Sequence, residues 1–144
     1  MKPNYISPSI FRAYDVRGEY PGEVNARVVE VIARAVGRHL SPGTVIIAHD
    51  GRTSSPALAF AAARGLAEAR TRTNIIDLGV ATTPMFYFFV AETGAAGGIM
   101  VTASHNPKGV NGLKTVGPGA FPISGTQVGE LTKRDVRDQR HAPR

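Results

Sequence analysis

The chain has 144 residues, 42% of them apolar, with 16 Gly, 10 Pro, no Cys and a formal net charge of +6. At this length a single core buries roughly 70% of the surface of the unfolded chain, so folding needs neither disulfides nor a structural metal. The lack of cysteine excludes a disulfide framework, a thiolate zinc site, an iron–sulfur cluster and a thiol nucleophile.

The first half of the chain alternates between helical and strand patterns. Apolar residues spaced three and four apart predict an amphipathic helix over residues 24–40. A short apolar run at residues 45–48 predicts a buried strand. Residues 58–69 repeat the helical spacing behind Pro56, a residue suited to the first turn of a helix.

The same alternation continues with a strand at residues 74–78, a helix that opens near Thr83 and Pro84, and a strand at residues 98–101. This βαβαβ order predicts an α/β fold, a single three-layer domain with a mostly parallel mixed sheet between helices. Short apolar pieces at residues 113–116 and 121–123 favour a hairpin-like excursion with one antiparallel edge strand.

The end of the chain is rich in basic residues. Ser124 is suited to cap a last helix that runs into this basic region. We divide the chain into a domain, residues 1–131, and a basic tail, residues 132–144, which is either the end of that helix or disordered. The tail supplies +3 of the +6 charge. Because no aromatic residues lie among its basic ones, we expect no nucleic-acid binding.

Nothing in the sequence predicts a membrane protein. The N-terminal residues carry no apolar segment of the kind found in secretory signals. The longest apolar stretches, residues 57–63 and 85–91, are too short to span a bilayer and are closed by Arg64 and Glu92. We therefore expect a cytoplasmic protein with no membrane partner.

Two polar loops, residues 49–55 and 102–109, follow predicted strands, where doubly wound sheets bind ligands. A third polar segment, residues 11–18, contains two arginines, which suit phosphate or carboxylate recognition. Ser104, in the second loop, could be held exposed beside backbone N–H groups that favour an anion. A turn or a helix cap is the commoner role of a serine in such a loop.

Five short segments form a distinctive series along the chain. They are residues 11–18 (FRAYDVRG), 50–52 (DGR), 82–84 (TTP), 98–107 (GIMVTASHNP) and 111–114 (NGLK). In this order they resemble the α-D-phosphohexomutases, specifically the phosphomannomutase/phosphoglucomutase group, over nearly the whole chain to about residue 123. TASHNP with a downstream NGxK is highly specific. The opening also resembles the mannose/glucose group more than the phosphoglucosamine mutases.

The resemblance implies a phosphoserine enzyme that moves a phosphoryl group between O1 and O6 of a glucose or mannose phosphate through a hexose 1,6-bisphosphate. Ser104 matches the residue that carries the phosphoryl group. Lys114 would be a proton shuttle or charge neutraliser, and Arg17 would lie near the phosphate. The other implied site residues support the loop or bind phosphate: His105, in the catalytic set, and Arg12, Tyr14 and Asn106.

Adjacency alone does not make His105 the base for Ser104, because neighbouring side chains usually point apart. The sequence also departs from the family pattern at His49, where the group often has arginine before Asp-Gly-Arg. This difference changes the charge expected of that loop.

The resemblance also implies cofactors and partners. In the family an Asp-Gly-Asp-x-Asp-Arg loop holds Mg²⁺, and this sequence has no such loop. Ser104, through its phosphate, is therefore the only metal contact that the resemblance assigns to this chain. A hexose 1,6-bisphosphate would be the activator. Since the family's enzymes have four domains, domains II–IV are the implied partners, and we expect the chain alone to be inactive.

Two other functions remain open. A noncatalytic stub, or a subunit of a split enzyme, would bind partner domains through an exposed apolar face. An unrelated serine hydrolase would need a base and an acidic partner near Ser104. No Gly-x-Ser-x-Gly elbow surrounds Ser104, which weakens the hydrolase hypothesis.

Overall fold

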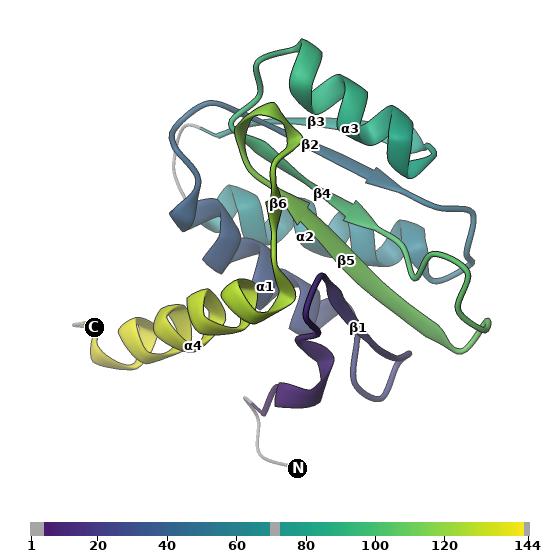
Figure 1. Cartoon of the computed structure of the whole chain (residues 1–144). Coiled ribbons are helices and arrows are strands. Elements are labelled where there is room, and N and C mark those ends of the chain that lie inside the picture. The colour runs from purple at the N-terminus through teal and green to yellow at the C-terminus, as the bar shows by residue number, and fades with distance from the viewer. Residues whose placement is uncertain (1–4, 70–72, 143–144) are drawn as a thin grey trace.

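A six-stranded mixed sheet forms the centre of the computed structural model, which describes residues 5–69 and 73–142 (Figure 1). Five strands lie in the order β1-β5-β4-β2-β3, and β6 pairs with β5. The strands are β1 (Val16–Glu19), β2 (Thr44–His49), β3 (Asn74–Val80), β4 (Gly97–Val101), β5 (Val110–Val116) and β6 (Pro122–Ile123).

Helices cover both faces of this sheet, so the fold has three layers (Figure 1). The helices are α1 (Ala26–His39), α2 (Ser55–Ala69), α3 (Thr83–Glu92) and α4 (Gly125–His141), with short 3-10 turns η1 (Pro8–Ile10) and η2 (Pro118–Ala120). The helix α1 packs against both α2 and α4 on one side, and α3 packs against β2 and β4 on the other. None of the described helices is both long and apolar enough to cross a membrane.

The central strands are buried on both faces, which explains their nearly continuous apolar sequences. In β2, Val45 and Ile47 belong to the core beneath α1 and α2, whereas Ile46 and Ala48 belong to the core beneath α3. Phe86 of α3 is fully buried in the second core. The α/β fold with three layers is therefore confirmed.

The helix starts follow from capping chemistry. The Thr82 hydroxyl oxygen accepts a hydrogen bond from the Met85 amide at the start of α3, with Pro84 in the first turn. Ser124, the predicted cap of the last helix, accepts one of 3.1 Å from the Gln127 amide. Each cap satisfies a backbone donor that the helix leaves free.

The antiparallel part of the sheet is larger than the sequence predicts. Among the described strands, only the β2–β3 and β2–β4 pairs are parallel, while β5 pairs antiparallel with β4, β1 and β6. The strand β1 was not predicted at all. Its sequence, VRGE, is too short and too polar to show an alternating pattern.

The helix α4 includes residues 132–141 of the predicted basic tail, so the boundary drawn at residue 131 falls inside a helix. Asp135 of α4 is buried and forms ion pairs with Arg34, at 2.9 Å, and with Arg38, both on α1. This packing explains why the helix continues through a strongly charged sequence. Residues 143–144 of the tail lie outside the described residues.

Gly65 is the point where α2 approaches α1 most closely. A Cβ atom added there would lie 2.2 Å from the Glu30 carbonyl oxygen and 2.9 Å from Cβ of Ala33. We expect Gly65→Ala to lower the free energy of unfolding by about 2 kcal/mol, even though alanine gains about 1 kcal/mol of helix propensity. Urea denaturation followed by circular dichroism measures this change.

Gly22→Ala is the matched control, because no atom lies within 4 Å of a Cβ added at Gly22. We expect the control to change the free energy of unfolding by less than about 0.5 kcal/mol. Equal stability of the two variants would contradict the close helix contact.

Candidate active site

Two polar loops meet at the carboxyl ends of β2 and β4, because these neighbouring strands run parallel. Residues 50–54 follow β2, and residues 102–109 follow β4. The Asp50 amide donates a hydrogen bond of 2.9 Å to the Val101 carbonyl oxygen, which joins the start of one loop to the end of the other strand. This edge is where doubly wound sheets bind ligands.

The third polar segment reaches the same region through β1. Arg17 of β1 lies opposite Gly112 of the antiparallel strand β5. Lys114 of β5 lies opposite Met100 of β4, one residue before the end of β4. The sheet register therefore brings the segments FRAYDVRG and NGLK to the loop that carries Ser104.

Ser104 is exposed on the loop after β4, as predicted. Its φ angle is 57°, in the left-handed region that non-glycine residues seldom adopt. Its amide donates a hydrogen bond of 2.9 Å to the Thr102 hydroxyl oxygen. Its Oγ lies 3.0 Å from Nδ1 of His105. The expectation that these neighbouring side chains point apart is wrong here, because it assumed an extended backbone.

Arg52 connects the first loop to the second. Its guanidinium donates hydrogen bonds to four backbone carbonyl oxygens of the loop that carries Ser104, at distances of 2.6 to 3.2 Å. The four acceptors are Ser104, Asn106, Pro107 and Val110. The Asn106 side chain closes the turn further by donating to the Ala103 carbonyl oxygen at 2.8 Å.

The Asp50 carboxylate holds these groups together. It accepts hydrogen bonds from the hydroxyls of Ser55 and Thr102 and from the amide and Nε of Arg52. Burial by itself would raise the pKa of this carboxyl group. The hydrogen bonds from Ser55, Arg52 and Thr102 outweigh that effect and hold the pKa of Asp50 below its usual value of 3.8.

Asp15 pairs with two predicted site residues at once. Its Oδ2 atom accepts from Nη2 of Arg17 at 2.7 Å and from Nζ of Lys114 at 3.1 Å. The carboxylate is buried, whereas the two cations are partly exposed. Nε of Arg17 is buried and has no hydrogen-bond partner in the part of the chain that the structure describes.

A shallow open groove of about 990 Å³ runs along this cluster. Five of the predicted site residues line it: Arg12, Tyr14, Arg17, Asn106 and Lys114. Ser104 and His105 lie outside the lining, on the same loop as Asn106. The structure thus brings five of the predicted site residues together along one groove. The other two, Ser104 and His105, directly precede Asn106 in the sequence.

Three residues of this cluster had no role predicted from the sequence. Asp50 and Arg52 lie in the DGR segment, and Asp15 lies in FRAYDVRG, so the motifs contained them. Both segments combine an aspartate with an arginine. This combination is the signal that could have identified the three residues. The His49 side chain is buried at the end of β2, with Nδ1 2.8 Å from the Asp50 carbonyl oxygen.

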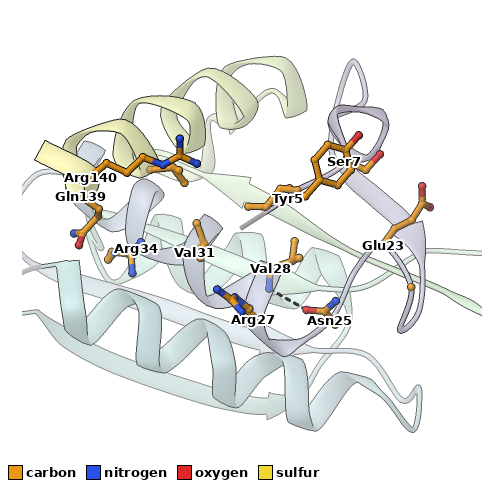
Figure 2. Close-up of a pocket in the computed structure, with 13 residues that line it drawn as sticks. Tyr5, Ser7, Glu23, Asn25, Arg27, Val28, Val31, Arg34, Gln139 and Arg140 are labelled. Carbon is orange, nitrogen blue, oxygen red and sulfur yellow. Dashed lines mark hydrogen bonds between the residues drawn. The ribbon is translucent and has the colours of Figure 1, made fainter. Parts of the chain in front are cut away.

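Another hollow, about 770 Å³ in volume, lies between α1, α4 and the N-terminal segment (Figure 2). Figure 2 shows Arg34 of α1 and Arg140 of α4 on one side and Tyr5 on the other. Of the residues described, none that the sequence predicts for the site lines this hollow. We therefore do not regard this hollow as the candidate active site.

The residues present do not by themselves fit the Mg²⁺ that the family resemblance implies. Mg²⁺ prefers an octahedral oxygen shell with one or more carboxylates. Residues 5–69 and 73–142 contain no group of three or more His, Asp or Glu side chains that could hold a metal. The two carboxylates of the cluster, Asp15 and Asp50, are already engaged by cations and hydroxyls.

Comparison with known proteins agrees with this geometry. The sequence model described as "Phosphoglucomutase/phosphomannomutase, alpha/beta/alpha domain I" matches residues 8–138. The chain therefore belongs to the phosphoglucomutase/phosphomannomutase family and corresponds to its domain I.

Several relatives carry names from this family. Phosphomannomutases of Klebsiella pneumoniae and Escherichia coli are each 45% identical over 80% of this chain, which corresponds to 72% and 25% of their own lengths. A crystal structure of a Burkholderia thailandensis phosphoglucomutase/phosphomannomutase family protein superposes with a TM-score of 0.82. It is 38% identical, over 94% of this chain and 31% of that protein. The chain thus spans about a quarter of the Escherichia coli relative.

The lowered pKa of Asp50 makes a prediction about acid stability. A carboxyl group with a lowered pKa in the folded state stabilises the fold above its unfolded value, 3.8, and loses this effect as the pH falls through the lower folded value. In Asp50→Asn this contribution is missing. We therefore expect the difference in unfolding free energy between wild type and Asp50→Asn to be constant above about pH 5 and to shrink below it.

Urea denaturation at a series of pH values measures this difference. Ser55→Ala and Thr102→Val each remove one donor to Asp50, so we expect them to show the same pH dependence to a smaller degree. A difference that stays constant down to the acid transition would contradict the role of Asp50.

Proposed function

We propose that this chain is the nucleophile domain of a phosphomannomutase/phosphoglucomutase, in which Oγ of Ser104 carries the phosphoryl group. The observation that carries the proposal is the position of Ser104, exposed after the carboxyl end of β4 and two residues along the chain from Asn106, which lines the groove. The cations Arg12, Arg17 and Lys114 line the same groove, together with the carboxylates of Asp15, Glu19 and Glu23. The names of the relatives support hexose phosphates, those of glucose or mannose, as substrates.

The proposed reaction has two balanced steps. In the first, the P–O bond to Oγ of phosphorylated Ser104 breaks, the phosphoryl group passes to the free hydroxyl of a hexose phosphate, and the proton of that hydroxyl passes to the freed Oγ. In the second, after the sugar has reoriented, Oγ attacks the other phosphate of the resulting 1,6-bisphosphate, the P–O bond to the sugar breaks, Ser104 is phosphorylated again, and the released sugar oxygen takes up a proton. In this proposal His105 accepts the serine proton in the second step and passes it on, a role supported by the distance of 3.0 Å between its Nδ1 and Oγ.

Charge compensation is the main demand of phosphoryl transfer, together with in-line positioning. Arg17 and Lys114 supply two positive charges, and their shared contact with Asp15 fixes both side chains before a ligand binds. In the proposal, Lys114 neutralises charge that develops on the reacting oxygens. A hexose 1,6-bisphosphate acts as activator because it can phosphorylate a free Ser104.

A second function, docking onto other domains, is favoured by a different observation. The outward side of α3 exposes three large apolar side chains, Met85, Phe88 and Phe89, which are 49%, 59% and 37% exposed. Apolar surface of this kind commonly marks an interface. Because the chain spans about a quarter of the Escherichia coli relative, we propose domains II–IV of the same enzyme type as partners, and the two functions are compatible.

Phosphoryl loading tests the nucleophile directly. When the chain is incubated with glucose 1,6-bisphosphate, we expect mass spectrometry to find one phosphoryl group on Ser104. Ser104→Ala should take up none, because the accepting oxygen is gone. Lys114→Ala should load about a hundredfold more slowly without losing the reaction, because charge stabilisation is lost and the nucleophile stays.

Ser41→Ala is the matched control, since Ser41 is an exposed serine between α1 and β2. It should load like the wild type. Equal loading of the Ser104→Ala variant would refute the assignment of the nucleophile.

Turnover by the chain alone tests the role of the partner domains. With mannose 1-phosphate, a 1,6-bisphosphate activator and Mg²⁺, we expect at least about a thousandfold less mannose 6-phosphate per minute than from the Escherichia coli relative. The reason is that an open groove cannot hold a reorienting intermediate, and the positioning it lacks can be worth on the order of 10⁵ in rate or more.

The remaining domains of the Escherichia coli relative can then be added as a separate polypeptide. Activity that appears only on addition supports docking. Rapid turnover by the 144-residue chain without them would contradict the proposed dependence on partner domains.

A further inference from the structure

Arg52 makes four hydrogen bonds to the loop that carries Ser104, and the proposed function gives this arginine no role. Its guanidinium reaches across 52 to 58 residues of sequence to four carbonyl oxygens of residues 104–110. We propose that Arg52 is a positioning residue that holds this loop in the conformation required for phosphoryl transfer. This inference rests on the proposed function of Ser104.

Apart from polar contacts, the loop has little to hold it. Five of the six residues 104–109 are exposed, and the sixth, Asn106, is half-buried. Apolar packing therefore cannot fix the loop, and its backbone conformation depends on polar contacts. The Arg52 side chain, 17% exposed, supplies four of these contacts from one planar group.

The Arg52 side chain is itself held in place by Asp50. One carboxylate oxygen of Asp50 accepts from Nε of Arg52 at 3.3 Å, and the other accepts from the Arg52 amide at 3.0 Å. Because Asp50 also accepts from Thr102, the carboxylate joins the guanidinium to the start of the loop. The terminal nitrogens of the guanidinium are thereby directed at the carbonyl oxygens.

The direction of these contacts suits an anion on the other side of the loop. In a trans peptide the C=O and the following N–H point to opposite sides. With the carbonyl oxygens of Ser104 and Pro107 turned to Arg52, the amides of His105 and Lys108 point away from it. Neither amide donates a hydrogen bond within the part of the chain that the structure describes. Arg52 thus binds the carbonyl oxygens that would repel a phosphoryl group and leaves the His105 and Lys108 amides free to donate to one.

Lysine cannot replace this geometry. The arginine fork presents up to five donors in one plane, whereas an ammonium has three donors around a single point. Arg52→Lys should keep the positive charge near Asp50 but reach fewer of the four carbonyl oxygens. It therefore separates the role of charge from the role of shape.

The experiment compares wild type, Arg52→Ala, Arg52→Lys and Arg64→Ala. Arg64 is the matched control, because its guanidinium is exposed and pairs with Glu30 of α1 instead of with the Ser104 loop. Amide hydrogen exchange of residues 103–110 reports loop order. Loading of Ser104 from glucose 1,6-bisphosphate, with and without added guanidinium ion at a concentration that leaves the fold intact, reports function.

We expect Arg52→Ala to exchange about tenfold faster in residues 103–110 and unchanged elsewhere. Its loading should fall about a hundredfold, as expected for a misplaced nucleophile, and recover in part with guanidinium ion. Arg52→Lys should lie between Arg52→Ala and wild type in both measurements, and Arg64→Ala should match wild type. A merely structural role would not produce rescue by guanidinium ion.

Loop exchange and loading at the wild-type level in Arg52→Ala would overturn the inference. If Arg52→Ala does not fold, wild-type loop exchange and loading in Arg52→Lys would overturn it instead. If wild-type Ser104 takes up no phosphoryl group while the exchange in the Arg52 variants changes as expected, the proposed function fails and the positioning of the loop by Arg52 stands.

Discussion

The pairing of β4 with β2 on one side and β5 on the other is the constraint on which the site depends. β4 runs parallel to β2, so their following loops leave the sheet at the same edge. β5 starts at that edge and runs back antiparallel along β4, so Lys114 lies opposite Met100, one residue before the end of β4. Gly98 permits the close packing, since a Cβ there would lie 2.7 Å from both the Ile46 carbonyl oxygen and the Phe86 ring.

The same constraint continues to the edge of the sheet. Gly112 of β5 lies opposite Arg17, and a Cβ added at Gly112 would lie 2.0 Å from the Val16 carbonyl oxygen. A glycine is therefore needed for β1 to pair there. Without this pairing, Asp15 would not reach the ammonium group of Lys114, 99 residues away in sequence. A structural glycine thus places the cluster of Asp15, Arg17 and Lys114 at the groove.

The charges of Asp15, Arg17 and Lys114 do not cancel. One buried carboxylate, Asp15, faces two cations, so each cation has an ion-pair partner while the three side chains together keep a net positive charge. Breaking a buried pair by removing one partner typically costs 3–5 kcal/mol. Arg17 and Lys114 stay partly exposed beside the buried Asp15, so under the proposed function a phosphate group would contact both cations without displacing the carboxylate.

The alternating strands and helices of residues 24–101 were predicted well, because the spacing of apolar residues shows directly which side chains are buried. Ser124 and the helix start at Thr83 followed from local capping and proline chemistry. The strand β1 could not be found this way, since four polar-rich residues become a strand only through pairing with β5. The motifs predicted Ser104, Lys114 and Arg17 as site residues. The loop contacts of Arg52 could not be predicted, because their acceptors are backbone carbonyl oxygens, which no pattern of side chains marks.

The left-handed backbone of Ser104 explains why the loop needs so many polar contacts. A non-glycine residue in this region costs about 1–2 kcal/mol relative to its preferred conformations. Glycine would remove the strain, but it has no side-chain oxygen to serve as the nucleophile of the proposed function. The conformation is held instead by the Thr102 hydroxyl on the amide of Ser104 and by Arg52 on its carbonyl oxygen. Both the Thr102 hydroxyl and the Arg52 guanidinium donate to the Asp50 carboxylate. This single carboxylate therefore helps to offset the strain of the backbone conformation in which Oγ of Ser104 lies beside His105.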